Sequence, residues 1–403
     1  MEPVDRIDSS ELELPVEPMH LRMGPAHPAT HGTIHIDLKL DGERVRDVDI
    51  RPGFLHRGFE KSCERGTWQQ VFPYVDRLNY CSPMINNAGF ALAVEKLLGI
   101  EAPERCVYYR VILSELNRIV DHLICVAAVA MEQGAFTPFL WLVKVRDWIW
   151  DVMEQETGAR VTHAFCRIGG MAKPPTPEFK QSVREVLPEI HKVIRETETL
   201  LLRNRIFIER NQSIGVLTQE EALSYGVTGP VLRSTGIDYD VRKANPYFGY
   251  DSYDFEIPVG HDGDNYDRFL VRMEECRQSC RIIEQALERM PNEGPIDVDD
   301  PRIVLPDKRE VYHTIEGTIA HFKLIMEGLK PPKGEVYSFT EGGNGELGFY
   351  IVSDGSGTPY RVHCRPPCFL NLKSAEFMMR GDMYADIVAT FGAVNMIGGE
   401  CDR

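Results

Sequence analysis

Two histidines, His27 and His31, stand in a turn-forming segment that reads GPAHPATHG between Gly24 and Gly32. A helix is disfavoured there because each proline lacks an N–H and drives the preceding residue out of the α region. The segment is therefore predicted to be a fixed turn that presents imidazole groups. Imidazole exchanges protons near neutral pH more readily than other side chains. On this spacing alone, a histidine-containing loop without chemistry is an equal alternative.

The element that must hold this turn is a β unit on its C-terminal side. Residues 33–40 alternate apolar and polar side chains, an Asp-Gly hairpin signal follows at 41–42, and 45–50 has the pattern of a return strand. We therefore expect an N-terminal β unit over residues 19–65 that carries the histidine turn at its mouth. Residues 1–18 are acidic with three prolines and are predicted to be a mobile arm.

Helical periodicity dominates the rest of the chain, which is predicted to be a helical bundle over residues 66–403. The expected helices begin at Pro103 and span about 138–157, 177–203, 265–290, 308–328 and 374–391. Two insertions interrupt the bundle. We expect loops with short strands near 205–262 and a β meander near 335–363. The fold class is therefore mainly α with added β.

One motif is a decoy. The segment GNGELG, from Gly343 to Gly348, matches the G-x-G-x-x-G pattern of dinucleotide-binding proteins. That site requires a helix after the glycines, because the helix N-terminus holds the pyrophosphate. Here the strand-like run FYIV follows. We therefore interpret the motif as a β-turn and expect no NAD site in this chain.

The composition excludes several classes of function. With 45 basic and 61 acidic residues the net charge is −16, which argues against a nucleic-acid partner, because such a partner requires a basic face. No apolar run reaches the ~18–20 residues needed to cross a bilayer, and the N-terminus lacks a signal-peptide pattern. The ten cysteines form no Cys-x-x-Cys pair, so reduced, buried thiols are expected.

Several sequence blocks together carry a family resemblance. In order they are HPATH at 27–31, GFLHRGFEK at 53–61, DRLNY at 76–80, AVEKLLG at 93–99, RVILSELNR at 110–118, GAFTPF at 134–139, DVRK at 240–243 and GELGFYIVSDG at 345–355. From about residue 20 to its end, the chain resembles the 49 kDa, or D, subunits of respiratory NADH–quinone oxidoreductase (complex I). The resemblance implies a fold shared with the large subunit of nickel–iron hydrogenases, a helical bundle.

Those hydrogenases hold their metal with two Cys-x-x-Cys pairs, and this sequence lacks both. The four matching positions are occupied by Asn79, Ser82, Ile397 and Glu400, while Cys81 and Cys401 are out of register. A thiolate pair cannot be rebuilt from these side chains. We therefore expect this chain to hold no metal and no other cofactor, and a hydrogenase catalytic subunit is a disfavoured alternative.

The resemblance implies a quinone in place of the metal. In the family, the histidine of the turn and a tyrosine after an Arg-x-x motif hydrogen-bond the quinone head group. The matching residues are His31 and Tyr80, with Arg77 opening the motif and His27 in the same turn. Two-electron reduction of a quinone creates a dianion that takes two protons. An imidazolium and a phenol could each donate one.

Two further residues are candidates for a proton path. The family places a carboxylate beside the turn histidine, and Glu132 stands there where Asp is usual. His122 lies ten residues earlier, about three helical turns, and therefore roughly on the same helix face. A core histidine with satisfied hydrogen bonds is the alternative for His122, and a core tyrosine is the alternative for Tyr80.

The resemblance also implies an electron donor, a four-iron four-sulfur cluster in a partner subunit. The family places an arginine against that cluster, and Arg57 matches it. It also places a histidine there in the pattern Arg-x-His-x-x-Tyr-x-Arg. This chain reads RVTHAFCR, with Thr162 at the histidine position, His163 one place later and Arg167 closing the pattern. If the segment is extended, His163 should point away from the cluster, because neighbouring residues alternate faces.

We therefore expect the quinone-binding subunit of a proton-translocating NADH–quinone oxidoreductase. Its expected partners are the iron–sulfur subunit and a membrane subunit that forms the quinone channel. These would hold the chain peripherally on the cytoplasmic face of the cell membrane. Alternatives are the same subunit in a complex fed by ferredoxin or deazaflavin, and a scaffold subunit without redox chemistry.

Overall fold

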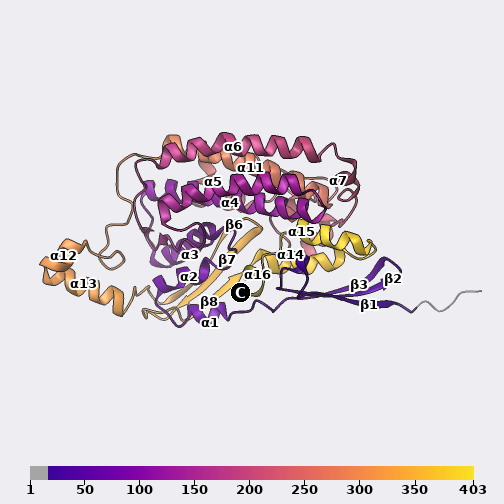
Figure 1. Cartoon of the computed structure of the whole chain (residues 1–403). Helices are drawn as coiled ribbons and strands as arrows, with labels where there is room; N and C mark the ends of the chain where they lie inside the picture. Colours follow the sequence, from indigo (N-terminus) through magenta and orange to yellow (C-terminus); the bar gives the residue numbers. More distant parts are fainter. Residues whose placement is uncertain (1–16) are drawn as a thin grey trace, which may run out of the picture.

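In the computed structural model, which describes residues 17–403, the longest helices form a bundle along one side of the molecule (Figure 1). These helices are α4 (Glu104–Glu132), α5 (Phe136–Thr157), α6 (Phe179–Leu201) and α11 (Asn265–Arg289). The predicted start of α4 after Pro103 is confirmed. The predicted end of α5 is also confirmed, because Gly158 terminates it with a φ of +84°, a conformation that glycine adopts without strain.

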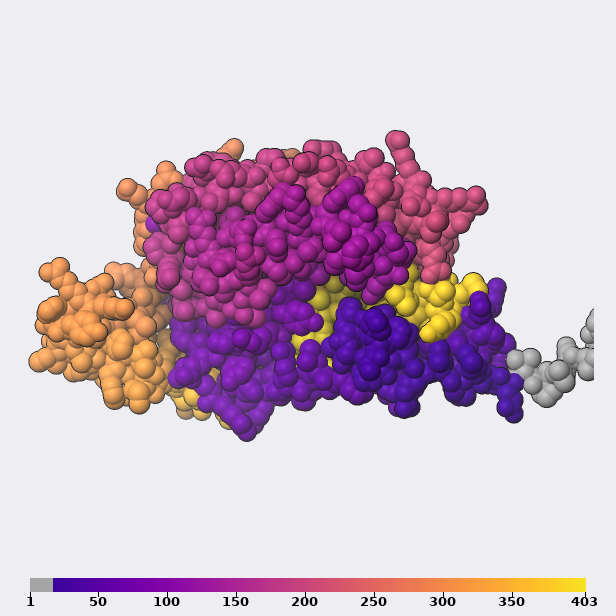
Figure 2. Space-filling model, in the orientation of Figure 1, coloured from indigo at the N-terminus to yellow at the C-terminus, as the bar shows by residue number. Residues whose placement is uncertain are grey.

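The N-terminal sheet lies at one end of the molecule (Figure 1). It consists of β1 (Met19–Met23), β2 (His35–Asp41) and β3 (Arg44–Arg51), in the order β1-β2-β3 with antiparallel pairs. The predicted hairpin at Asp41-Gly42 is therefore present. Alternate residues of β2 and β3 are buried in a second hydrophobic core, where they pack with C-terminal helices. Figure 2 shows this N-terminal unit, in indigo, against the yellow C-terminal segment.

The second large sheet is the predicted meander. Strands β6 (Gly334–Gly342), β7 (Gly345–Ser353) and β8 (Arg361–Arg365) pair in antiparallel order, and β6 packs on α3 (Pro83–Leu98). The glycine-rich motif lies at the β6–β7 turn and leads into a strand, as predicted. A Cβ on Gly343 would lie 2.0 Å from an Asp121 carboxylate oxygen. This glycine is therefore required for the turn to approach the interior of α4.

Short helices replace the strands that we expected within 205–262. They are α7 (Arg205–Glu209), α8 (Gln219–Tyr225), α9 (Pro230–Arg233), α10 (Val241–Ala244) and the 3-10 turn η3 (Tyr250–Ser252). Side-chain caps explain three of these starts, because Asn204, Thr218 and Asp240 each accept a hydrogen bond from the first helical turn. The strand prediction was wrong for this region.

The single C-terminal helix expected over 374–391 was also wrong. The segment forms α14 (Pro367–Met378), the 3-10 turn η4 (Tyr384–Asp386), α15 (Ile387–Val394) and α16 (Gly398–Asp402). Gly381, at φ +90°, breaks the chain between α14 and α15. The expected helix over 308–328 is likewise two helices, α12 (Lys308–His313) and α13 (Ile315–Met326), because the Thr314 side chain caps the second.

Smaller elements complete the fold. They are the 3-10 turns η1 (Pro28–Thr30) and η2 (Trp68–Val71), the helices α1 (Phe59–Cys63) and α2 (Phe72–Val75), and the short pair β4 (Cys166–Arg167) and β5 (Gly170–Met171). The predicted arm, residues 1–18, lies outside the described residues except for its last two. None of the helices between residues 17 and 403 combines the length and apolar character that a membrane span needs.

Candidate functional site

The histidine turn is fixed by its own residues. His27 caps η1, because its Nδ1 accepts a hydrogen bond from the Ala29 amide at 3.2 Å. His31 ends the turn with a φ of +54°, a left-handed conformation that histidine adopts more often than most residues. The turn therefore uses His27 for structure and presents His31, whose side chain is 47% exposed.

His31 lies beside the end of the longest helix. Its Nε2 is 3.8 Å from a carboxylate oxygen of Glu132, the last residue of α4, and its ring packs edge-on against Phe391 of α15. The structure therefore brings together the two residues that the sequence paired. The second Glu132 oxygen is buried and has no hydrogen-bond partner in residues 17–403.

Tyr80 occupies the loop between α2 and α3 and is 38% exposed. Burial of its hydroxyl raises the pKa of Tyr80 to about 12, and the Cys81 and Cys368 thiols add to this rise. The Arg57 charge and the Gly398 amide oppose it. Tyr80 is therefore a neutral phenol at physiological pH and can donate a hydrogen bond or a proton.

Two arginines of the predicted site hold the backbone near Tyr80. The Arg57 guanidinium donates to the carbonyl oxygens of Arg77 at 2.6 Å and Gly399 at 3.3 Å. Arg77 itself donates to the Pro73 carbonyl at 2.5 Å, within α2. Arg57 therefore joins the end of α2 to α16, and burial lowers its pKa from the ordinary value.

The positions that match metal ligands form hydrogen bonds instead. The Asn79 amide and the Ser82 hydroxyl donate to one Asp121 oxygen at 2.7 and 2.8 Å, and the Asn395 amide donates to the other at 3.0 Å. Asp121 is fully buried in the middle of α4. We did not predict this role for Asp121, although a carboxylate in an otherwise apolar helical segment was a visible signal.

The cluster continues from Asn395 to Glu400. Asn395 donates to the Asn344 side-chain oxygen at 2.7 Å, Asn344 donates to the Cys368 sulfur at 3.3 Å, and the Cys368 thiol donates to Glu400 at 2.8 Å. Burial raises the pKa of Glu400 to about 8, and the Asp121 charge adds to the rise. In residues 17–403 no group of three or more His, Cys, Asp or Glu side chains is arranged to hold a metal ion.

The predicted cluster-facing segment is not extended. Thr162 and Ala164 have φ values of +53° and +40°, so the alternation that we assumed does not apply. His163 is buried, its Nε2 lies 3.2 Å from the Arg160 carbonyl, and burial lowers its pKa to about 4. Arg167 donates to the Ala164 carbonyl at 2.6 Å.

Asp76 connects this segment to the Tyr80 loop. One Asp76 oxygen accepts the Ala164 amide at 2.7 Å. The charges of Arg77 and Arg167 both stabilise its ionised form, while burial raises the pKa of Asp76 to about 7. The structure therefore places Arg77, Arg167 and the residues around His163 in one region.

His122 lies deeper in the bundle. It is fully buried on α4, and its Nε2 lies 2.8 Å from Glu275 of α11. Burial lowers the pKa of His122, and the hydrogen bond to Glu275 opposes this effect. His122 therefore does not touch His31 or Tyr80 directly, and the polar groups around it belong to the bundle interior.

The fold and site define a mixed α and β protein in which proton-exchanging side chains lie beside a buried polar cluster. A family model described as "Respiratory-chain NADH dehydrogenase, 49 Kd subunit" matches residues 132–403. The chain is 63% identical, over the full length of both proteins, to the first of the D subunits named for the NADH-quinone oxidoreductase of Sorangium cellulosum. It is 52% identical to the D subunit of the Myxococcus xanthus enzyme, covering 98% of this chain and 95% of that protein.

The chain therefore belongs to the family of 49 kDa subunits of respiratory-chain NADH dehydrogenase. It is one subunit of a multi-subunit NADH–quinone oxidoreductase, and other subunits of that complex are its partners. A relative in Bdellovibrio bacteriovorus is named as a combined C/D subunit of NADH-quinone oxidoreductase. It is 47% identical to this chain, which covers 68% of its length.

Proposed function

We propose that this chain provides the protein groups that bind and protonate the quinone head group. His31 and Tyr80 are assigned to its two carbonyl oxygens. Both side chains keep more than a third of their surface exposed, so both can reach a ligand. Tyr80 carries the proposal, because its raised pKa keeps the phenol protonated beside the positively charged Arg57.

The chemistry assigned to these groups is proton donation. A quinone that receives two electrons must take two protons to become a quinol. Tyr80 Oη supplies one proton and the His31 imidazolium the other. Glu132 lies 3.8 Å from His31 and stabilises its charged form. Arg57 stabilises the tyrosinate left behind until it is reprotonated.

The electrons are assigned to a four-iron cluster of a partner iron–sulfur subunit. When bound, that subunit supplies one electron at a time to the quinone. Arg57, Arg77 and Arg167 lie in the region where Asp76 joins two loops, and their positive charges suit a negatively charged cluster. The quinone channel is assigned to a membrane subunit, with this chain peripheral on the cytoplasmic face. The relative with the combined C/D name supports the C subunit as a further partner.

The alternatives have less support. A hydrogenase role is disfavoured because Asn79 and Ser82 are engaged by Asp121. A complex fed by ferredoxin or deazaflavin is not favoured, because the relatives are named NADH–quinone oxidoreductase subunits. A scaffold role without redox chemistry is an outcome of the following experiment.

The test is Tyr80→Phe in the intact complex, which keeps the ring and removes the phenolic proton. We expect quinone reductase turnover to fall at least about tenfold. Reduction of artificial acceptors that take electrons before the quinone should be unchanged. Tyr74→Phe is the matched control, because Tyr74 is an exposed tyrosine of α2. Equal turnover of both variants would refute the proposed function.

A further inference from the structure

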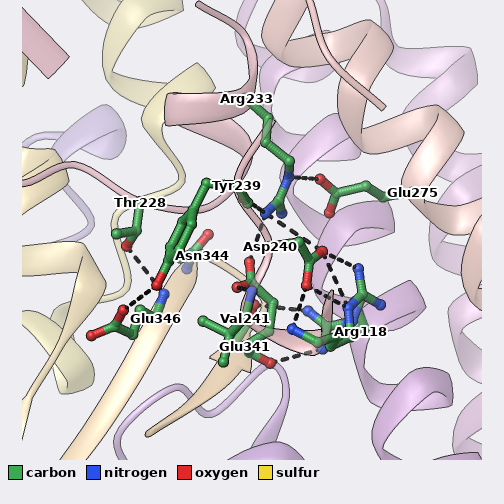
Figure 3. A network of polar contacts seen from close by, with 12 residues as sticks. Arg118, Thr228, Arg233, Tyr239, Asp240, Val241, Glu275, Glu341, Asn344 and Glu346 are labelled. Carbon is green, nitrogen blue, oxygen red and sulfur yellow. Dashed lines mark hydrogen bonds and ion pairs between the residues drawn. The ribbon is translucent and has the colours of Figure 1, made fainter. Parts of the chain in front are cut away.

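A chain of ion pairs crosses the bundle interior from His122. Glu275 lies 2.8 Å from His122 and 2.7 Å from Arg233, and Arg233 lies 2.9 Å from Glu341. Figure 3 shows the contacts from Glu275 to Glu341, and Asp240 beside them. The chain joins α4, α11, α9 and β6. It is far too buried for screening by solvent, because none of these side chains is more than 1% exposed.

The network continues on the far side of Arg233. Asp240 lies 3.6 Å from Arg233 and 2.6 Å from Arg242, and Arg242 lies 3.1 Å from Glu115, which also pairs with Arg118 at 3.2 Å. Two further charges act on His122, those of Asp121 on its own helix and Arg272 on α11. Helix α15, which also packs on α4, contributes no charged side chain between Ile387 and Val394.

The charges of this network do not balance. It contains five carboxylates and four guanidinium groups, all at most 2% exposed; they are Glu115, Asp121, Asp240, Glu275, Glu341, Arg118, Arg233, Arg242 and Arg272. Arg268, next to Arg272, lies near Asp264 and Asp267 and does not remove the negative excess. An excess charge in a low-dielectric interior is unfavourable, so the network favours one bound proton.

Two groups can hold that proton. Burial raises the pKa of Glu341, and the adjacent Asp240 charge adds to the rise. His122 is the other, because its ring accepts a proton at Nδ1 while Nε2 remains on Glu275. Burial disfavours the charged imidazolium, whereas the negative excess and the Glu275 contact favour it. These opposed effects allow a small change in nearby charge to move the proton.

Buried atoms without protein partners lie between His122 and Glu132. They are His122 Nδ1, Glu132 Oε2, Arg268 Nε, and Nε and Nη2 of Arg272, none of which has a hydrogen-bond partner in residues 17–403. They belong to one region, because the Arg272 charge acts on both His122 and Cys125, and the Glu132 charge also acts on Cys125. Each such atom left unpaired would cost about 1–3 kcal/mol.

The mixture of donors and acceptors identifies what pairs with them. The arginine atoms donate, whereas His122 Nδ1 and Glu132 Oε2 accept. An anion would be repelled by the two acceptors, and a cation by the two arginines. Water satisfies both kinds of atom, and buried water with two to four polar partners is a normal part of protein interiors. Internal water at this position would join His122 to Glu132 and so to His31.

We propose that the network from His122 to Glu341 stores one exchangeable proton and returns it through internal water to Glu132 and His31. The inference rests on the proposed function, because it assigns His31 a proton to replace. When His31 gives its proton to the reduced quinone, the stored proton moves from His122 to Glu132 and His31, and the network becomes one unit more negative. The network then recovers its proton from solvent.

The first test is His122→Gln in the intact complex. The glutamine amide can still donate to Glu275 but cannot bind a proton. We expect quinone turnover to fall at least about tenfold, with the alkaline limb of the pH profile moved to lower pH. His191→Gln, at a half-buried histidine of α6 outside the network, is the control. A fall in turnover with an unchanged pH profile would show a structural role only and would overturn the inference.

A second pair of variants tests the water. Cys125→Leu fills the region with an apolar group and touches neither histidine, whereas Cys125→Ser keeps it polar. We expect the leucine variant to reproduce the His122→Gln pH profile and the serine variant to match the natural complex. Cys106→Leu, at a buried cysteine near the start of α4, controls for overpacking. Equal profiles of both Cys125 variants would overturn the inference.

Failure of the inference can be distinguished from failure of the proposed function. If Tyr80→Phe loses quinone turnover while His122→Gln and Cys125→Leu do not, the quinone site stands and the proton store is refuted. If Tyr80→Phe also retains turnover, the proposed function itself is refuted.

Discussion

The substitution Thr162→His tests how this chain influences the partner's iron–sulfur cluster. The natural residue cannot titrate in the physiological range. Thr162 is a β-branched residue at φ +53°, where such residues are strained and histidine is better tolerated. The replacement is therefore compatible with the backbone and introduces an imidazole at the position where the family pattern has one.

The effect of His163 can be worked out from its burial. Its pKa is about 4. To be half-protonated at pH 6 when the cluster is reduced, its pKa must rise by about 2 units, or ~2.7 kcal/mol. One added negative charge supplies that energy at an effective dielectric constant of about 20 only within about 6 Å. His163 is buried and faces the Arg160 carbonyl, so we expect it to remain neutral.

We therefore predict that the potential of the adjacent cluster changes by less than about 15 mV per pH unit between pH 6 and 8. With Thr162→His, reduction should couple to proton uptake, and the potential should fall with rising pH by up to about 59 mV per unit, the value for one proton per electron. The assay is a redox titration of the intact complex at several pH values, with the cluster followed by electron paramagnetic resonance. A steep slope in the natural complex that is lost in His163→Ala would refute the reasoning.

Three further predictions concern the buried cluster around Asp121. Asp121→Ala removes the acceptor of three buried donors. We expect it to cost ~2–6 kcal/mol, seen as a lower melting temperature of the complex; an unchanged melting temperature would contradict the assigned contacts. Gly343→Ala places a Cβ 2.0 Å from an Asp121 oxygen and should lower the melting temperature similarly, whereas Gly99→Ala, which meets no atom within 4 Å although Gly99 has a positive φ, should lower it less. Because the pKa of Glu400 is raised from 4.5 to about 8, the stability that its protonated form contributes is lost as pH rises through that range; Glu400→Gln should flatten this dependence, and an identical dependence in the variant would assign it elsewhere.

Local sequence patterns predicted the elements that depend on neighbouring residues. The hairpin after Asp41-Gly42 and the end of α5 at Gly158 are such cases, since alternation or a single glycine determines each. The C-terminal helices were mispredicted because Gly381 breaks an otherwise continuous helical pattern. A glycine within an apolar periodic segment does not by itself show whether the chain turns.

The buried cluster shows what the sequence could not reveal. Asp121 accepts hydrogen bonds from residues 42, 39 and 274 positions away, so their assembly depends on how α3, α4 and α15 pack. The pairing of His31 with Glu132 was predicted only through the family resemblance, because 101 residues separate them in the sequence. The role of Thr162 and His163 in the electron path remains a prediction.

The assignment of the quinone to His31 and Tyr80 can be checked by an experimental structure of the intact complex with quinone bound. We predict one carbonyl oxygen of the head group within about 3.2 Å of Tyr80 Oη and the other within that distance of a His31 ring nitrogen. A quinone head group bound elsewhere, with neither residue within hydrogen-bond distance of it or linked to it by a single water, would contradict the assignment.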